Sequence, residues 1–140
     1  MSNNTTFDTF LAMANAKAKT RKRPDDEEHC IQASCVRWFR LKYPRLRHNL
    51  FAVPNGARRD KSTGAKLKAE GVLAGVADLI LLKSNRFYGA LLIEMKTERG
   101  RQSPNQQEWE KHITADGYKY VVCRSLDEFR KTVTEYLADI

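Results

Sequence analysis

The pattern of apolar positions predicts two adjacent β-strands in the second half of the chain. The apolar runs 77–82 and 89–95 are separated by the polar stretch 83–86, as in a hairpin. Further apolar runs predict a short strand over 50–53 and another over 118–123. Because the strands are apolar almost throughout, we expect helices to cover both faces of the sheet that they form.

Helices are predicted before, between and after these strands. Either residue of the pair Asp25–Asp26 can cap a first helix that runs to about Lys42. A second helix is predicted over 61–70, and capping boxes at Ser103 and Ser125 open two more. The order α-β-α-β-β-α-β-α predicts an α/β domain with a mixed central sheet of about four strands flanked by helices.

Composition indicates one folded domain that is preceded in the chain by a basic arm. The chain has 140 residues, of which 41% are hydrophobic, which is enough for a single core. Residues 1–24 are polar and end in a basic cluster, so we expect a flexible arm there and a folded domain over 25–140. There is no bilayer-length apolar stretch, no secretory pattern and no Cys-x-x-Cys pair among the three cysteines. These features predict a cytoplasmic protein without a membrane partner.

The net charge of +8 is unevenly distributed along the chain. Residues 1–24 hold five Lys or Arg against one Asp, and residues 37–70 hold ten against two acids. Residues 25–36 between them hold four carboxylates and no Lys or Arg. This distribution suits a protein that binds phosphates and a cation. The alternative explanation is that the basic residues only form a solvated surface. Charge therefore points to nucleic acid as a partner and leaves catalysis open.

Three charged side chains interrupt the apolar hairpin, where an unpartnered charge is costly. Glu94 and Lys96 share one face of their strand and Met95 points to the other, while Asp78 lies near Glu94 if the hairpin pairs in register. Two carboxylates and a lysine suit Mg²⁺-dependent phosphodiester hydrolysis, with the Met95 carbonyl as a further ligand. Lys96 can hold the attacking water or clamp the phosphate. The alternative is that Lys96 forms only a salt bridge.

Two other residues have both a chemical and a structural interpretation. Glu28 lies one turn from Ile31 on the first helix, which favours it over Glu27 as a third carboxylate; either residue can also simply oppose the helix dipole. Gln106 is the third residue of the capping box at Ser103, a structural role. It can alternatively reach the phosphate or orient the lysine.

Six motifs occur in a fixed order between residues 28 and 117. They are Glu28-x-x-Ile31-Gln32, Pro54-Asn55-Gly56, Lys66-Leu67-Lys68-Ala69-Glu70-Gly71, Gly75-Val76-Ala77-Asp78-Leu79, Ile93-Glu94-Met95-Lys96 and Ser103-x-x-Gln106-x-x-Trp109. This ordered set resembles the VRR-NUC (virus-type replication and repair nuclease) group of the PD-(D/E)xK superfamily, which has a restriction-endonuclease-like core. One departure is Ala77, where the family often has proline.

The resemblance implies specific roles for the candidate residues. Glu28, Asp78 and Glu94 are expected to bind Mg²⁺, with Mn²⁺ as a substitute, and Lys96 to be the catalytic lysine. A glutamine at the position of Gln106 is a feature of the family, which favours a functional role for this residue. The chain looks like the stand-alone form typical of bacteriophages and bacteria.

Stand-alone members are associated with cleavage of branched DNA, Holliday junctions in particular, as homodimers. The segment 1–11, or the terminal helix with Val133, Tyr136 and Leu137, is a candidate dimer interface. Five basic residues and the arm at 17–23 are expected to contact DNA phosphates: Arg58, Arg59, Lys61, Lys66 and Lys68. The alternatives are a flap, single-strand or restriction-like nuclease and, in a different class, a non-catalytic DNA-binding accessory protein.

Overall fold

The computed structural model describes Thr9, residues 24–54 and residues 61–140. The predicted arm lies almost wholly outside the described residues. The same holds for two of the predicted DNA contacts, Arg58 and Arg59, and for the side chain of Lys61.

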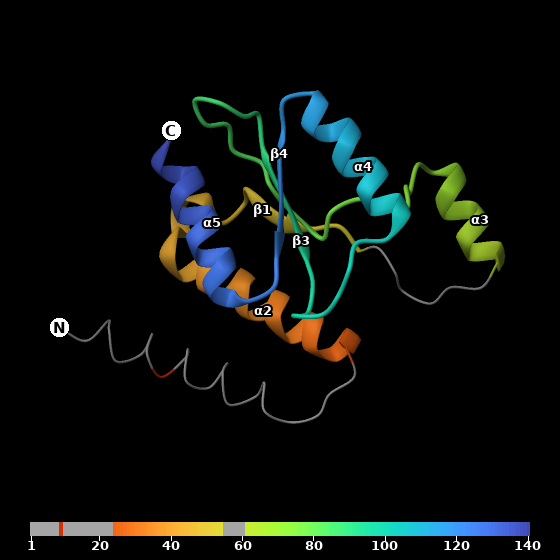
Figure 1. Cartoon of the computed structure of the whole chain (residues 1–140), viewed down its shortest axis with the longest axis horizontal. Helices are drawn as coiled ribbons and strands as arrows, with labels where there is room; N and C mark the ends of the chain where they lie inside the picture. The colour runs from red at the N-terminus through yellow and green to blue at the C-terminus, as the bar shows by residue number, and fades with distance from the viewer. Residues whose placement is uncertain (1–8, 10–23, 55–60) are drawn as a thin grey trace.

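Helices and strands follow one another along the chain in the predicted order (Figure 1). The helices are α2 (Pro24–Lys42), α3 (Lys61–Ala69), α4 (Pro104–Ala115) and α5 (Leu126–Ala138). The strands are β1 (Leu50–Ala52), β2 (Leu79–Leu81), β3 (Leu91–Met95) and β4 (Lys119–Cys123), and a short 3-10 helix, η1 (Pro44–Leu46), follows α2. None of the described helices combines the length and the apolar character needed to cross a membrane.

The four strands form one mixed sheet in the order β1-β2-β3-β4. Strands β1 and β2 pair antiparallel, as do β2 and β3, whereas β3 and β4 pair parallel. The prediction of a mixed four-stranded α/β fold is therefore confirmed. Because β3 and β4 are parallel, their carboxyl ends lie at the same end of the sheet, together with the start of β2.

Helices cover both faces of the sheet, as the apolar strands predict (Figure 1). On one face, Phe39 of α2 and Phe129 of α5 belong to the larger apolar cluster, together with Ile93 of the central strand. On the other face, Trp109 of α4 packs against a smaller cluster that includes Leu92. Strand β3 is buried along its whole length, so any charge on it lies inside the protein.

Three local features differ from the sequence prediction. Helix α2 begins at Pro24, one residue before the predicted caps, because proline is well suited to the first helical turn. The connection between β2 and β3 is longer than the predicted four residues and is closed by Asn85, whose side-chain oxygen accepts from the amides of Phe87 and Tyr88. At α5, Ser125 caps the helix, but the side chain of Glu128 accepts from the amide of Arg124 instead of from that of Ser125.

Candidate active site

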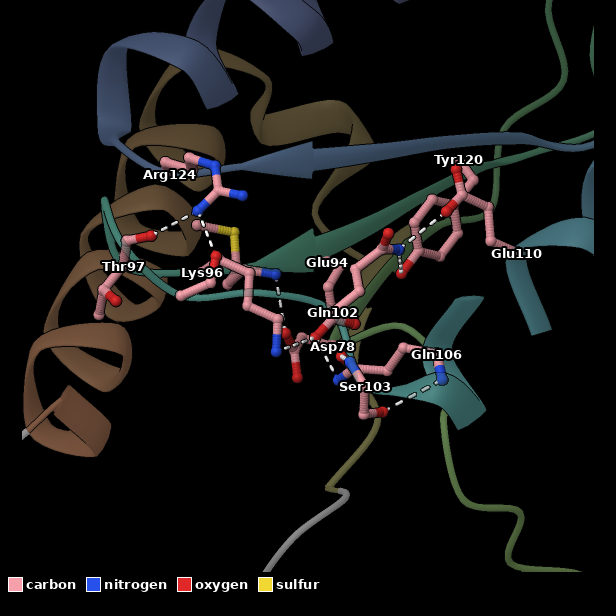
Figure 2. Close-up of polar contacts among 12 residues, drawn as sticks. Asp78, Glu94, Lys96, Thr97, Gln102, Ser103, Gln106, Glu110, Tyr120 and Arg124 are labelled. Atoms are coloured by element: carbon pink, nitrogen blue, oxygen red, sulfur yellow. Dashed lines mark hydrogen bonds and ion pairs between the residues drawn. The ribbon is translucent and has the colours of Figure 1, made fainter. Parts of the chain in front are cut away.

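The strand register brings Asp78 next to Glu94. Leu79 pairs with Ile93, so the next step outward places Asp78 opposite Glu94, on the same face of the sheet. The Asp78 carboxylate also accepts a hydrogen bond from the backbone amide of Met95, at 2.8 Å between Oδ2 and N. Figure 2 shows the two acids beside each other at the end of the central strand. The register on which the sequence analysis made this proximity depend is therefore the one present in the structure.

Glu94 is the one charged side chain that is fully buried among the described residues, with 1% of it exposed. Its Oε1 accepts a hydrogen bond from Nε2 of Gln106 at 2.8 Å and lies 3.5 Å from Nζ of Lys96. Its Oε2 is buried and has no hydrogen-bond partner among the described residues. Burial, and then repulsion from Asp78, raise the pKa of Glu94 to about 8, although the Lys96 ammonium acts in the opposite direction.

The donor set at this point fits a hard divalent cation. Two adjacent carboxylates repel each other, and the buried Oε2 of Glu94 accepts no hydrogen bond from any described residue; a cation removes both costs. The amide of Met95 points to Asp78, and the carbonyl of the same residue points to the same side of an extended strand. Asp78, Glu94 and the Met95 carbonyl are therefore suitable cation ligands.

Glu28 lies in the second turn of α2 and is partly exposed. No three His, Cys, Asp or Glu side chains of the described residues gather closely enough to share an ion. The role of Glu28 as a third ligand therefore stays a prediction.

Lys96 is held at the edge of this acidic pair. Its side chain is 12% exposed, and its backbone amide donates to the carbonyl of Cys123 at 3.0 Å, which continues the pairing of β3 with β4. The ion pair with Glu94 that the sequence left as an alternative is present.

Gln106 forms the predicted helix cap and also makes a contact with Glu94 that the sequence analysis did not predict. Its Oε1 accepts from the amide of Ser103 at 2.8 Å, while Oγ of Ser103 accepts from the amide of Gln106 at 3.2 Å, which completes the capping box of α4. Its Nε2 donates to Glu94, as Figure 2 shows. The side-chain amide of Gln106 thus caps the first turn of α4 and also forms a hydrogen bond with the buried carboxyl group of Glu94.

Two residues that the sequence analysis did not assign to the site also shape it. Gly75 has a φ of +91°, and a Cβ there would lie 2.5 Å from the carbonyl oxygen of Asn105. Only glycine lets the segment before Asp78 pass this close to the start of α4. The position of this glycine, three residues before the acid, is the feature of the sequence that could have indicated its role. Arg124 contacts the turn after Lys96, and no sequence pattern marks it.

The predicted DNA contacts within the described residues lie on α3. Lys66 and Lys68 are exposed on this helix, which lies beyond α4 in Figure 1. The chain leaving α3 passes the start of α4 at Gly75 and then reaches Asp78, so the segment 70–77 connects this basic helix to the acidic pair.

The fold and the site together indicate a class of protein. The sheet is mixed and flanked by helices, and an acid pair and a lysine lie at one end of its central strands. This arrangement is consistent with a restriction-endonuclease-like nuclease core. The family model of the VRR-NUC domain matches residues 13–127. A solved structure described as a VRR_NUC domain protein has a TM-score of 0.69 and 25% sequence identity, and the match covers 79% of this chain and 88% of that one. A search of curated proteins found no match. The chain belongs to the VRR-NUC domain family, a nuclease family, and DNA is the substrate that this implies.

Proposed function

We propose that this protein is a Mg²⁺-dependent endonuclease that cuts branched DNA, four-way junctions in particular, and acts as a homodimer. The observation that carries the proposal is that Asp78 and Lys96 both lie beside Glu94, a buried carboxylate whose Oε2 has no hydrogen-bond partner among the described residues. Such a group is costly to keep unless it binds something.

Each residue of the candidate site has a role in this proposal, which its contacts support for Asp78, Glu94, Lys96 and Gln106. Asp78, Glu94 and the Met95 carbonyl hold Mg²⁺ or Mn²⁺, with Glu28 as a further ligand. When bound, the ion neutralises charge on the scissile phosphate and activates a water molecule. Lys96, 3.5 Å from Glu94, donates to a phosphate oxygen or to that water. Gln106 keeps Glu94 in one orientation through its hydrogen bond.

The DNA backbone is bound by the basic residues on and before α3. Lys66 and Lys68 are exposed there, and Arg58, Arg59 and Lys61 extend the set along the chain. Phosphate contacts position an enzyme without reading bases, so we expect little sequence specificity.

Junction cleavage by a dimer is supported by the family resemblance and by symmetry. A four-way junction is resolved by two nicks related by a two-fold axis, which a two-fold dimer supplies. One predicted interface needs correction: Val133 and Tyr136 of α5 are 0% and 2% exposed because they pack against the sheet of their own chain, and Leu137 packs beside them. The other predicted interface, segment 1–11, lies outside the described residues except for Thr9.

The test is cleavage of an end-labelled four-way junction, a matched duplex and a flap with Mg²⁺, Mn²⁺ or EDTA. We expect paired, symmetric nicks in the junction, lost in EDTA and in Asp78→Asn. Asp116→Asn is the matched control because Asp116 is exposed at the far end of α4. Cleavage of flaps or plain duplex instead would keep the active site and reject the junction assignment. Binding without cleavage under either metal would favour the non-catalytic accessory protein.

A further inference from the structure

Arg124 binds three carbonyl groups of the turn that follows Lys96. Its Nη1 donates to the carbonyl oxygens of Thr97 at 2.8 Å, Glu98 at 3.2 Å and Gly100 at 2.5 Å. Figure 2 shows the guanidinium reaching this turn from the end of β4. Arg124 directly follows Cys123, which pairs with Met95, so its backbone is anchored on the strand next to the one that carries the candidate site.

The turn needs a cation at this point because its carbonyl oxygens converge. Oxygens that point to one place repel each other, and a positive group among them relieves this repulsion, as at the end of a helix. Arginine suits the task because it remains charged at all ordinary pH values and its hydrogen bonds are charge-assisted. The amide of Gly100 donates to the carbonyl of Thr97 at 3.2 Å and closes the turn around the guanidinium.

The same turn lies beside the Lys96 side chain. A Cβ built at Gly100 would lie 3.4 Å from Cδ of Lys96 and 3.1 Å from Oγ1 of Thr97. The backbone of Gly100 therefore runs next to the aliphatic part of the lysine, and the turn begins at the residue that directly follows this lysine. The other fixed points are the lysine amide, bound to the carbonyl of Cys123 at 3.0 Å, and the ammonium, 3.5 Å from Glu94.

We infer that Arg124 is a positioning residue of the nuclease site: by fixing the turn 97–100, it holds the Lys96 ammonium beside Glu94. The inference rests on the proposed function for its kinetic consequence, although the contacts are independent of it. A long side chain with many rotamers is useful in catalysis only if something restricts it. Arg124 does so from a neighbouring strand, through the turn that it fixes.

The first experiment measures the exposure of Lys96 and does not require activity. Wild-type protein, Arg124→Gln and Arg124→Lys, all as the full chain, are treated with a low dose of acetic anhydride, and the modification of each lysine is followed by mass spectrometry. We expect Lys96 to react several-fold faster in Arg124→Gln, while Lys111 and Lys131 keep their rates. Arg86→Gln is the matched control because Arg86 is exposed at the opposite end of the sheet.

The second experiment separates positioning from binding in the cleavage assay. We expect Arg124→Gln to lower kcat by about 10- to 100-fold with KM unchanged, and Arg124→Lys to restore part of it, because a small misplacement of a reacting group is enough for such losses. If Arg124→Gln does not fold, Arg124→Lys carries the test, because lysine keeps the positive charge but lacks the planar set of donors that binds several carbonyl oxygens at once.

Three outcomes overturn the inference. The first is a wild-type rate of Lys96 acetylation in both Arg124 variants, and the second is an unchanged kcat in them. The third is a faster reaction of all lysines together, which indicates general loosening of the fold. If the wild-type protein cleaves none of the DNA substrates, the proposed function fails, and the acetylation experiment still decides whether Arg124 restrains Lys96.

Discussion

Gln106 joins the first turn of α4 to the buried carboxylate of Glu94. The oxygen of its amide accepts from the backbone of Ser103 at 2.8 Å, and the nitrogen donates to Oε1 of Glu94 at 2.8 Å. The cap fixes which end of the amide faces the acid, because the oxygen is already in use. A helix-capping residue therefore also orients the only fully buried charged group of the described residues.

Gln106→Glu should separate these two roles. Glutamate also completes a capping box, so the helix should be retained. In the Mg²⁺-bound state, in which Glu94 is ionised, the hydrogen bond to Glu94 is lost and replaced by repulsion between two carboxylates. Because a hydrogen bond to a charged group contributes about 1.5–3 kcal/mol, we expect cleavage to fall by about 10- to 100-fold. Thermal unfolding and kcat measured on the same preparations check this.

Gln106→Ala is the companion variant, since it removes both contacts. We expect it to lower stability by about 1 kcal/mol through the cap, in addition to the loss of activity. Wild-type cleavage rates in Gln106→Glu would show that the contact with Glu94 has no catalytic importance.

Glu94 should make the metal-free protein less stable as the pH rises. Its pKa is about 8 in the folded chain and near 4.5 when unperturbed, so between these values the folded state keeps a proton that the unfolded state has lost. Stability is therefore greatest below the lower value and falls as the pH approaches 8, by about 1 kcal/mol per pH unit for one such group. Glu94→Gln should flatten this dependence and raise the Tm near pH 8 in EDTA, while abolishing cleavage.

Mg²⁺ should reverse part of this effect, because it binds the ionised carboxylates and competes with the proton. We expect the increase in Tm on adding Mg²⁺ to grow as the pH rises, and to disappear in Glu94→Gln. Thermal unfolding from about pH 5 to pH 9 measures both trends. Glu135→Gln on the exposed side of α5 is the control, and an identical pH dependence in Glu94→Gln and wild type would contradict the buried, proton-binding state of Glu94.

The basic residues of α3 should determine part of the salt dependence of DNA binding. Each phosphate contact contributes roughly 0.9 to the slope of log K against log salt concentration. The double variant Lys66→Ala/Lys68→Ala should therefore reduce the slope by roughly 1–2, similarly for junction and duplex DNA. Binding measured in EDTA over a series of salt concentrations tests this, with Lys131→Ala on α5 as the control. An unchanged slope would remove α3 from the DNA-contact surface.

The three cysteines should differ in reactivity. Cys35 and Cys123 are 0% exposed, and burial raises the pKa of both thiols, that of Cys123 to about 11. Cys30 is partly exposed on α2. A thiol reagent should therefore modify one cysteine quickly in the native protein and the other two only on unfolding. Cys30→Ser should remove the fast phase, and rapid modification of all three would be inconsistent with the packing of α2 on the sheet.

The sequence by itself was sufficient for the parts of this protein that depend on local patterns. The apolar runs, the polar break at 83–86 and the capping box at Ser103 predict the elements and their order. The candidate residues Asp78, Glu94 and Lys96 stand out because they are charges within apolar runs. The fold class and these candidate residues therefore follow from the order and spacing of residues along the chain, whereas the register that places Asp78 opposite Glu94 was a condition that the structure supplied.

Tertiary structure decided the contacts between residues far apart in the chain. Val133 and Tyr136 look like a free apolar stripe in sequence, and only packing against the sheet shows that they are core residues. The hydrogen bond from Gln106 to Glu94 depends on where α4 begins relative to β3. The clamp of Arg124 on the turn after Lys96 joins segments 24 residues or more apart, and no local spacing encodes it. A sequence pattern specifies secondary structure through near neighbours, whereas burial and the orientation of site residues arise only when the elements pack.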